Sequence, residues 1–354
     1  LSRLPPELTV DIPDERIAQY PTERRDASRV LIYDSSHKEV IHIGNFPDIV
    51  DFLSDELIIR NNTRVIPALV DGKKSGGGAV QVLFLVSNRN FEHESGADRI
   101  EVKALINPGR RLKPGLTISL PNGAFYILGE KAPGGKWSGN WTSENGESFS
   151  SWLSRAGMSP LPPYIRRKPD GSDLERYQTV YAKQAGSLAA PTAGLHFTDE
   201  VLDGLRSRGN QIESVSLDVS LGTFIPIRGD DIAGHDMHTE SYDIPEETSQ
   251  VINREIANQK PITAIGTTVI RTLEGAAEKS IPLKPGRDST NIFIYPPRKL
   301  RVVKKLLTNF HRSDSTLMQL VAAMIGWEGV NITYQTALDN GFRFYSYGDA
   351  MLIL

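Results

Sequence analysis

Residues 262–274, ITAIGTTVIRTLE, combine a short apolar strand with the start of a helix. The apolar run over 262–266 predicts a buried strand, and Thr267 or Thr268 can cap the helix that follows. Gly266 permits another group to approach the backbone closely at the junction. The same alternation recurs around it, with strands predicted at 262–266, 291–295 and 306–310 and helices at 246–258, 268–278 and 315–326. Alternation of this kind is typical of an α/β sheet.

A different pattern occupies residues 65–150, where short β segments are separated by glycine and proline. Strands are predicted at 79–86, 99–106, 116–120 and 124–128. Closely spaced strands without helical periodicity indicate a small antiparallel barrel or sandwich. We therefore expect an α/β fold in which a larger mixed domain, residues 1–64 and 151–354, is interrupted by an inserted β-barrel domain, residues 65–150. Earlier elements of the larger domain are predicted as strands at 29–35 and 38–44, a helix over 45–55, and strands at 57–59 and near 215–221.

The composition excludes several classes of protein. A chain of 354 residues is long enough for two domains, and 39% hydrophobic with 23% charged residues is ordinary for a globular protein. The absence of cysteine excludes disulfides, thiolate metal sites and cysteine nucleophiles. No apolar run approaches the ~20 residues of a membrane span, so we expect no membrane partner and a cytoplasmic location. The net charge of −3 gives no global attraction to RNA, but four basic clusters could form a local RNA-binding face: Lys73–Lys74, Arg110–Lys113, Arg166–Lys168 and Arg298–Lys305.

The segment 189–197, AAPTAGLHF, ends in a histidine just before a predicted helix. Thr198 is a suitable N-cap, so the loop would deliver His196 close to a helix N-terminus. The positive end of that helix would lower the imidazole pKa and keep the ring neutral. An ordinary turn with a histidine that has no role is the alternative interpretation.

A third junction, 306–317, LLTNFHRSDSTL, again places a histidine between a strand and a helix that Asp314 or Ser315 could cap. On the helix after Gly266, Arg271 and Glu274 share one face and could equally form an internal ion pair. Polar groups at several strand–helix junctions of an α/β sheet commonly meet in one ligand-binding cleft. The motif 234–245, GHDMHTESYDIP, also permits a metal site through His235, His238 and Glu240, although polar substrate contacts or loop hydrogen bonds fit it better.

Together these segments resemble the S-adenosylmethionine:tRNA ribosyltransferase-isomerase family of queuosine biosynthesis. The motifs that carry the resemblance run in order through most of the chain: 17–19, 26–29, 61–68, 161–165, 175–181, 189–197, 221–224, 237–240, 266–274, 307–311 and 344–352. The resemblance implies an α/β domain with an inserted β-barrel. It also implies that S-adenosylmethionine is a consumed ribosyl donor, that no metal takes part, and that the partner is the tRNA anticodon loop with an aminomethyl-deazaguanine wobble base. The oligomeric state is left open between a monomer and a weak homo-oligomer.

The family's reaction suggests roles for individual residues. A base must take a proton from the ribose carbon beside the sulfonium, and His196 is the first candidate, with His311 and the pair His238–Glu240 as further catalytic candidates. Arg271 and Glu274 could hold the methionine group or the ribose hydroxyls. The other expected substrate-binding residues are Thr63, Arg64, Tyr177, Gln178, Thr192, Gly194, Gly266, Thr267, Thr268, Asn309, Ser315, Tyr347 and Asp349.

The chain departs from the family pattern at several charged positions. Asn62 stands where an aspartate is usual, Asp218 where a histidine is usual and Asp314 where a lysine is usual, while Leu69 and Asn107 replace arginines. These departures leave one alternative to an active family member, a divergent relative that binds RNA or a nucleoside with little turnover. A metal hydrolase built on His235, His238 and Glu240 is a more remote alternative.

Overall fold

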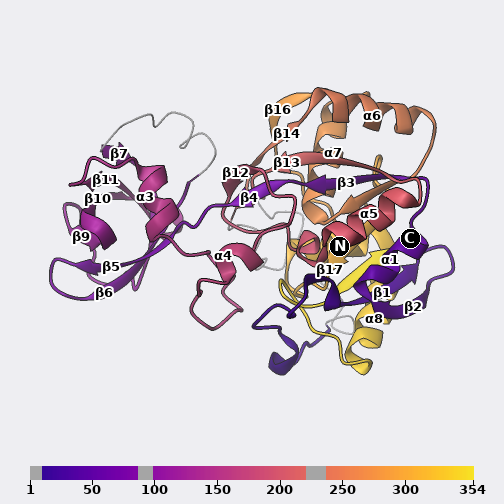
Figure 1. Ribbon diagram of the computed structural model, residues 1–354, viewed down its shortest axis with the longest axis horizontal. Coiled ribbons are helices and arrows are strands. Elements are labelled where there is room, and N and C mark those ends of the chain that lie inside the picture. The colour runs from indigo at the N-terminus through magenta and orange to yellow at the C-terminus, as the bar shows by residue number, and fades with distance from the viewer. Residues whose placement is uncertain (1–9, 87–98, 221–236) are drawn as a thin grey trace.

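The computed structural model describes residues 10–86, 99–220 and 237–354. A large mixed sheet with helices and a separate antiparallel barrel lie side by side (Figure 1). This arrangement confirms the predicted fold class. Within the described residues, no helix is both long and apolar enough to cross a membrane.

The large sheet has nine strands, and its centre is parallel. In spatial order they are β16 (Gly286–Thr290), β14 (Glu240–Ile244), β13 (Gln211–Leu217), β3 (Leu57–Asn61), β15 (Ile262–Ile265), β17 (Lys305–Asn309), β18 (Ala350–Ile353), β1 (Arg29–Asp34) and β2 (Glu39–Asn45). The central strands β13, β3, β15 and β17 run parallel. Their carboxyl ends therefore meet at one edge of the sheet, where α/β folds bind ligands.

Helices cover both faces of this sheet, because the central strands are apolar on both sides. Alternate residues belong to opposite cores: Ala264 of β15 packs with one face and Ile265 with the other. One face carries α6 (Glu246–Ala257), α7 (Thr267–Lys279) and α8 (Thr316–Asp339). The other carries η4 (Phe46–Asp48), α1 (Ile49–Phe52), η7 (Thr192–His196) and α5 (Asp199–Ser207).

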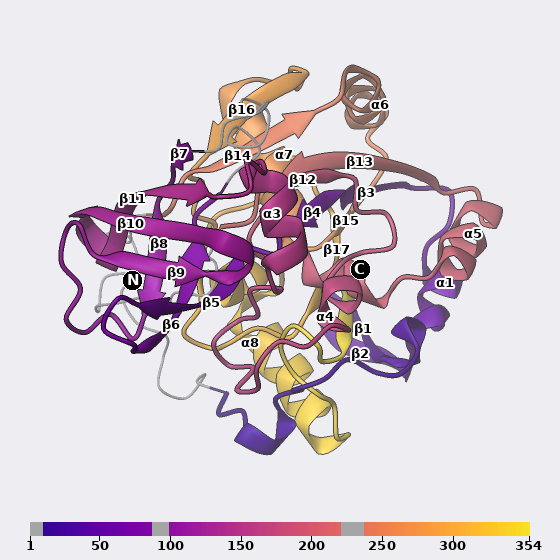
Figure 2. The same cartoon turned by 60° about the vertical axis from the view of Figure 1, so that its left-hand side comes forward.

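The barrel is closed by the pairing of β10 with β11. Its strands are β5 (Leu69–Lys74), β6 (Ala79–Phe84), β7 (Arg99–Glu101), β8 (Ala104–Asn107), β9 (Thr117–Leu120), β10 (Ala124–Lys131) and β11 (Lys136–Ser143), in the order β10-β9-β5-β6-β8-β11-β7 (Figure 2). Trp152 and Leu153 of α3 (Phe149–Ala156) belong to the barrel core. We therefore propose that the inserted domain extends through α3, beyond the predicted limit of residue 150.

The remaining elements are short and lie outside the strands of the large sheet and the barrel. They are η2 (Asp14–Arg16), η3 (Arg25–Ala27), β4 (Thr63–Val65), η5 (Pro121–Gly123), η6 (Pro133–Gly135), α4 (Asp173–Arg176) and β12 (Gln184–Ser187). β4 and β12 form a two-stranded parallel sheet. The segment around α4 lies between the barrel and the large sheet in both views (Figures 1 and 2).

Several predicted elements differ from the structure. The strand expected at 99–106 is divided into β7 and β8, the strand expected near 215–221 ends at Leu217, and β5 and β11 were not predicted. The strand expected at 291–295 is replaced by β16, because β14 offers partners only from Glu240 to Ile244, opposite Thr290 to Gly286. The helix predicted to end at residue 326 does end there, because Gly326 has non-helical backbone angles, and a second helical stretch within α8 continues to Asp339. Gly326 adopts a φ of 70°, and beyond it Val330 and Tyr334 pack into the core. Burial of these residues stabilises the second helical stretch, which the sequence did not predict.

Candidate active site

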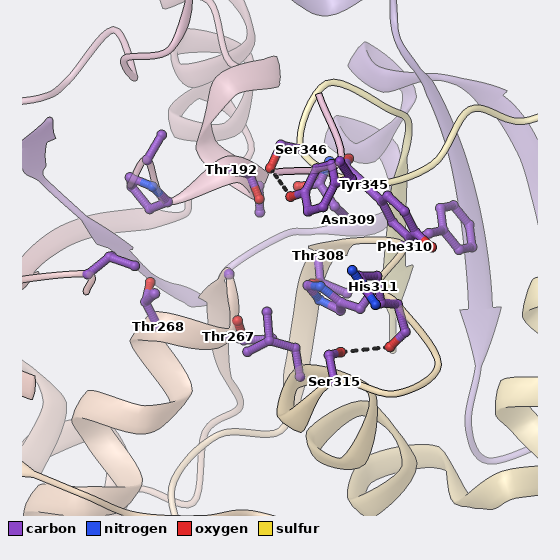
Figure 3. A pocket seen from close by; sticks show the side chains of 18 of the residues that line it. Thr192, Thr267, Thr268, Thr308, Asn309, Phe310, His311, Ser315, Tyr345 and Ser346 are labelled. Carbon is purple, nitrogen blue, oxygen red and sulfur yellow. Dashed lines mark hydrogen bonds between the residues drawn. The ribbon is translucent and has the colours of Figure 1, made fainter. Parts of the chain in front are cut away.

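The three strand–helix junctions singled out in the sequence meet in one pocket at the carboxyl ends of β15 and β17 (Figure 3). The empty space inside it, counted to the open mouth, is about 730 Å³. Its lining residues are Tyr164, Ala190–Ala193, Val219, Gly266–Thr268, Thr308–Arg312, Asp314, Ser315, Leu317, Tyr345 and Ser346. The pocket thus includes Thr192, Gly266, Thr267, Thr268, Asn309, His311 and Ser315 from the predicted set.

Asn309, the last residue of β17, is a fully buried wall of this pocket. Its Nδ2 donates to Nε2 of His196 at 3.1 Å and faces the carbonyls of Tyr345 at 3.2 Å and Asp349 at 3.4 Å. Three acceptors around one nitrogen determine which way the amide points. Its Oδ1 is buried and has no hydrogen-bond partner among the residues that the structure describes. A buried acceptor without a partner in a pocket wall is suited to an N–H or O–H group of a ligand.

His196 stands behind Asn309 and does not line this pocket. Its Nε2 accepts from Asn309, so Nδ1 carries the proton and donates to Oγ of Ser28 at 2.7 Å. Burial, followed by the charge of Arg343, lowers the pKa of His196 to about 3. The imidazole is therefore neutral, as predicted, but burial rather than a helix end is the main cause. Thr198 does cap α5, since it accepts from the backbone of Val201.

His311 is the histidine that lines the pocket. Its Nε2 lies 2.7 Å from Oγ1 of Thr308, and its backbone N–H donates to the hydroxyl of Tyr334. Burial lowers the pKa of His311 to about 3, so this ring is also neutral at physiological pH. Nδ1 has no hydrogen-bond partner among the described residues. When Nε2 donates to Thr308, Nδ1 is free to accept a proton.

Two aromatic residues that the sequence analysis did not single out form another wall of the pocket. The rings of Tyr164 and Tyr345 lie 4.8 Å apart, and the Tyr164 hydroxyl is 2.6 Å from Oγ of Ser346. Tyr345 adopts a φ of 71°, an uncommon backbone conformation for a tyrosine that often marks functional positions. Both tyrosines lie inside quoted family motifs, 161–165 and 344–352, which was the signal that could have identified them.

The first turn of α7 opens into the pocket without a side-chain cap. Gly266 occupies the N-cap position with a φ of 89° and offers no oxygen to the backbone N–H groups of Thr267 and Thr268. Free N–H groups at a helix start favour an anionic group. At α8 the N-cap residue does carry a side chain, and Ser315 accepts from the backbone N–H of Met318 and donates to the carbonyl of Arg312.

Arg271 and Glu274 are not brought into the pocket. Arg271 forms a buried ion pair with Glu240 and also donates to the carbonyl of His238. Glu274 accepts from three consecutive backbone N–H groups, 301–303. The alternative of an ion pair within the helix is wrong, since each residue has other partners. The side chain of His238 is exposed, away from the pocket lining.

Other predicted residues make internal contacts. Gln178 bridges both backbone groups of Val65, at 2.9 and 2.8 Å, and Thr63 is 2.7 Å from the Ser187 hydroxyl. Arg64 is exposed. A Cβ on Gly194 would come within 2.2 Å of the Tyr181 hydroxyl, so this position needs glycine.

The C-terminal loop contributes further structural contacts. Tyr347 donates to Asp173 at 2.7 Å, and its ring packs edge-on against that of buried Tyr177. Asp349 accepts from the backbone N–H groups of Arg29 and Arg343, at 3.0 and 2.7 Å. Tyr347 and His196 both line a smaller pocket beside the main one.

No group of three or more histidine and carboxylate side chains is arranged for a metal among the residues that the structure describes. Glu240 is occupied by Arg271, and His235 lies outside the described residues. The contacts of Glu240 thus remove one of the three ligands considered for a metal hydrolase.

Known proteins resemble this chain over nearly its whole length. The family described as "Queuosine biosynthesis protein" matches residues 7–353. The S-adenosylmethionine:tRNA ribosyltransferase-isomerase of Citrifermentans bemidjiense is 44% identical, over 97% of each chain, and that of Geobacter sulfurreducens is 42% identical, over 98% of each chain. This chain belongs to the S-adenosylmethionine:tRNA ribosyltransferase-isomerase family. The crystal structure of the S-adenosylmethionine tRNA ribosyltransferase from Thermotoga maritima is also similar, with a TM-score of 0.53 and 27% identity, and the match covers 98% of this chain and all of that one.

Of the departures from the ribosyltransferase-isomerase pattern, one lines the pocket. Asp314 pairs with Arg312 through both carboxylate oxygens, at 2.9 and 2.8 Å, and so neutralises a cation of the pocket wall. Asn62 instead accepts from the Ser216 hydroxyl at 2.6 Å, outside the lining. Asp218 closes over Gly186, where a Cβ would meet its carboxylate at 2.0 Å.

Proposed function

We infer that this chain catalyses the reaction of its family. It transfers and isomerises the ribosyl part of S-adenosylmethionine onto the aminomethyl-deazaguanine wobble base of tRNA. The product is epoxyqueuosine, and adenine and methionine are released. S-adenosylmethionine is a substrate here, consumed as the ribosyl donor.

The observation that carries a site assignment is the unpartnered Oδ1 of Asn309 in the main pocket. S-adenosylmethionine offers several N–H and O–H donors, whereas a purely apolar ligand would leave this oxygen unsatisfied. The uncapped first turn of α7 suits the methionine carboxylate, and the Tyr164–Tyr345 pair suits a stacked base. We therefore place S-adenosylmethionine in this pocket.

His311 replaces His196 as our proposed proton acceptor. The sulfonium acidifies the adjacent ribose carbon, but a neutral base in the pocket must still take the proton. His311 lines the pocket and has a free Nδ1, while both nitrogens of His196 are engaged. His196 is better suited to positioning, because it orients the Asn309 amide. Arg271 and Glu240 are proposed to support the wall at Val219, since Glu240 accepts from the neighbouring backbone N–H of Ser220.

Incubation with S-adenosylmethionine and tRNA carrying the precursor base tests this function. Adenine release and epoxyqueuosine formation should appear with the precursor tRNA and not with tRNA carrying an unmodified guanine. A chelator should leave the rate unchanged, since we propose that no metal takes part. RNA binding without adenine release would instead support the divergent binding module.

A further inference from the structure

Three of the four basic clusters seen in the sequence come together around one groove on the barrel. The groove, about 1630 Å³ when counted to its open mouth, lies between β5, β6, β9 and the segment 161–169. Lys73 and the residues 166–168 line it. Asn107 and Pro108 also line it, directly before the Arg110–Lys113 cluster. The Lys74 ammonium donates to the Arg110 carbonyl at 2.9 Å, which holds that loop beside β5.

Most of these cations have no carboxylate partner. Lys73, Lys168, Arg110, Arg111 and Lys113 are exposed and form no ion pair with any residue that the structure describes. Two cations of the three clusters do have carboxylate partners. Arg166 pairs with exposed Asp14 at 2.8 Å, and Arg167 pairs with buried Asp173 at 2.6 Å. Asp71, the acidic residue of the lining, accepts from Gln81.

The fourth cluster differs in this respect. Arg298 pairs with Glu278, Lys305 pairs with Glu56, and Arg301 donates to the carbonyl of Ala277. Lys299 and Lys304 of this cluster are exposed and form no ion pair with the residues that the structure describes, so the cluster is only partly neutralised. On a chain of net charge −3, the groove therefore concentrates unpaired positive charge in one place.

The groove and the main pocket are adjacent along the chain. Tyr164 lines the pocket, while its neighbours Pro163 and Ile165 line the groove. Consecutive Cα atoms are about 3.8 Å apart, so the two hollows share the segment 161–169 as a common wall. A nucleotide whose base enters the pocket would have its backbone beside this wall.

We propose that the groove binds the sugar-phosphate backbone of the tRNA anticodon arm and so presents the wobble base to the pocket. The proposal rests on the proposed function, because it takes the main pocket as the site of the reacting base. Lys73, Lys168 and the 110–113 loop contact phosphates, which contributes affinity without base readout. The proline-rich segment 161–163 supplies an apolar edge to the groove.

Two double variants test the groove, Lys73→Glu with Lys168→Glu, and Arg110→Glu with Arg111→Glu. Each should weaken tRNA binding by at least about tenfold near 0.1 M salt and lower the slope of log K against log salt by about one for each lost phosphate contact. Affinity for S-adenosylmethionine should stay unchanged. The matched control is Lys260→Glu, an exposed lysine at the opposite, amino-terminal end of β15.

The readouts separate the groove from the reaction. tRNA binding is measured by fluorescence anisotropy without S-adenosylmethionine, so it reports on the groove even if no adenine is released by the unaltered protein. Adenine release by that protein tests the proposed function by itself. Unchanged tRNA affinity in both double variants, or an equal loss in Lys260→Glu, would overturn the groove assignment. An anticodon stem-loop that binds equally well to wild type and variants would also overturn it.

Discussion

Asn309 and His196, 113 residues apart in the chain, share a hydrogen bond of 3.1 Å that determines the state of both side chains. Because the amide nitrogen also faces two backbone carbonyls, it must donate to Nε2 of the imidazole. The proton of His196 therefore resides on Nδ1, and the amide oxygen is left for a ligand. Through this contact a histidine outside the pocket orients a side chain that lines it.

Replacing Asn309 by aspartate tests this contact. A carboxylate has no proton to donate to Nε2, so the pKa of His196 should rise and its titration should be visible at a higher pH by imidazole ¹⁵N NMR. Adenine release should fall at least about tenfold, equivalent to about 1.4 kcal/mol of transition-state stabilisation. A variant with unchanged turnover and an unchanged Nδ1–H tautomer would show that the amide does not orient a substrate.

His311→Gln tests the proposed proton acceptor. Glutamine retains a polar group beside Thr308 but cannot take up a proton, so turnover should fall by about 10²–10⁴-fold while S-adenosylmethionine still binds. Single-turnover adenine release and equilibrium binding separate these effects. His37→Gln, at an exposed histidine paired with Asp34, is the control. If His311→Gln keeps its rate and His196→Ala alone loses activity without loss of stability, His196 is the base.

The stability of the fold should fall as the pH is lowered through the range of an ordinary histidine. In the folded protein burial lowers the pKa of His196 and His311 to about 3, against 6.5 for a free histidine. Between these values the unfolded chain binds the extra protons, so stability is full above about pH 6.5 and decreases toward pH 3. The unfolding free energy should decrease by at most about 1.4 kcal/mol per pH unit for each histidine.

Urea unfolding of wild type and His196→Gln at pH 7, 6 and 5 would measure this slope. Acidic groups contribute equally to both proteins, so the difference between them isolates His196. Parallel curves over this range would contradict a buried neutral imidazole.

The Arg271–Glu240 pair should behave as a structural unit. Arg271→Met alone leaves a buried carboxylate without its partner and should cost about 3–5 kcal/mol of unfolding free energy. Adding Glu240→Gln should recover part of the loss, and the KM for S-adenosylmethionine of the double variant should remain close to that of wild type. Lys279, on the same helix as Arg271, forms a half-exposed pair with Asp288 of β16, and Lys279→Met should cost less than about 1 kcal/mol. A large rise in that KM in the double variant would instead indicate that Arg271 binds the methionine group.

Adding a cation to the groove should strengthen tRNA binding. Asn107 is exposed at the end of β8 and lines the groove, as does Leu69. Asn107→Arg should lower the KM for precursor tRNA by about two- to fivefold at low salt, since one further phosphate contact becomes available. Asn258→Arg, beyond the end of α6, is the matched control. Equal effects of the two substitutions would point to net charge rather than to the groove.

Local patterns in the sequence were sufficient for the fold class. Apolar runs and alternation identified β15, β17 and the barrel strands β6, β9 and β10, but not β5 or β11. The cap at Thr198 follows from its side chain and the residues just after it. These signals depend on a few neighbouring residues, so they can be recognised before any tertiary contact is known. The strand expected at 291–295 does not form, because a strand needs a neighbouring strand to pair with. All five residues of β14 already pair with β16, residues 286–290.

The pairing of polar side chains depended on the tertiary structure. Arg271 could have paired with Glu274 on its own helix, yet Glu240, 31 residues earlier, neutralises it. Likewise, the four basic clusters look alike in the sequence. Only the packing of the barrel against the segment 161–169 gathers three of them, while carboxylates pair with Arg298 and Lys305 of the fourth. The sequence by itself therefore determined which elements form and which junctions carry polar groups. Which of those groups stay free for a ligand was decided by strand order and packing, because a buried polar group binds whichever partner the fold brings within reach.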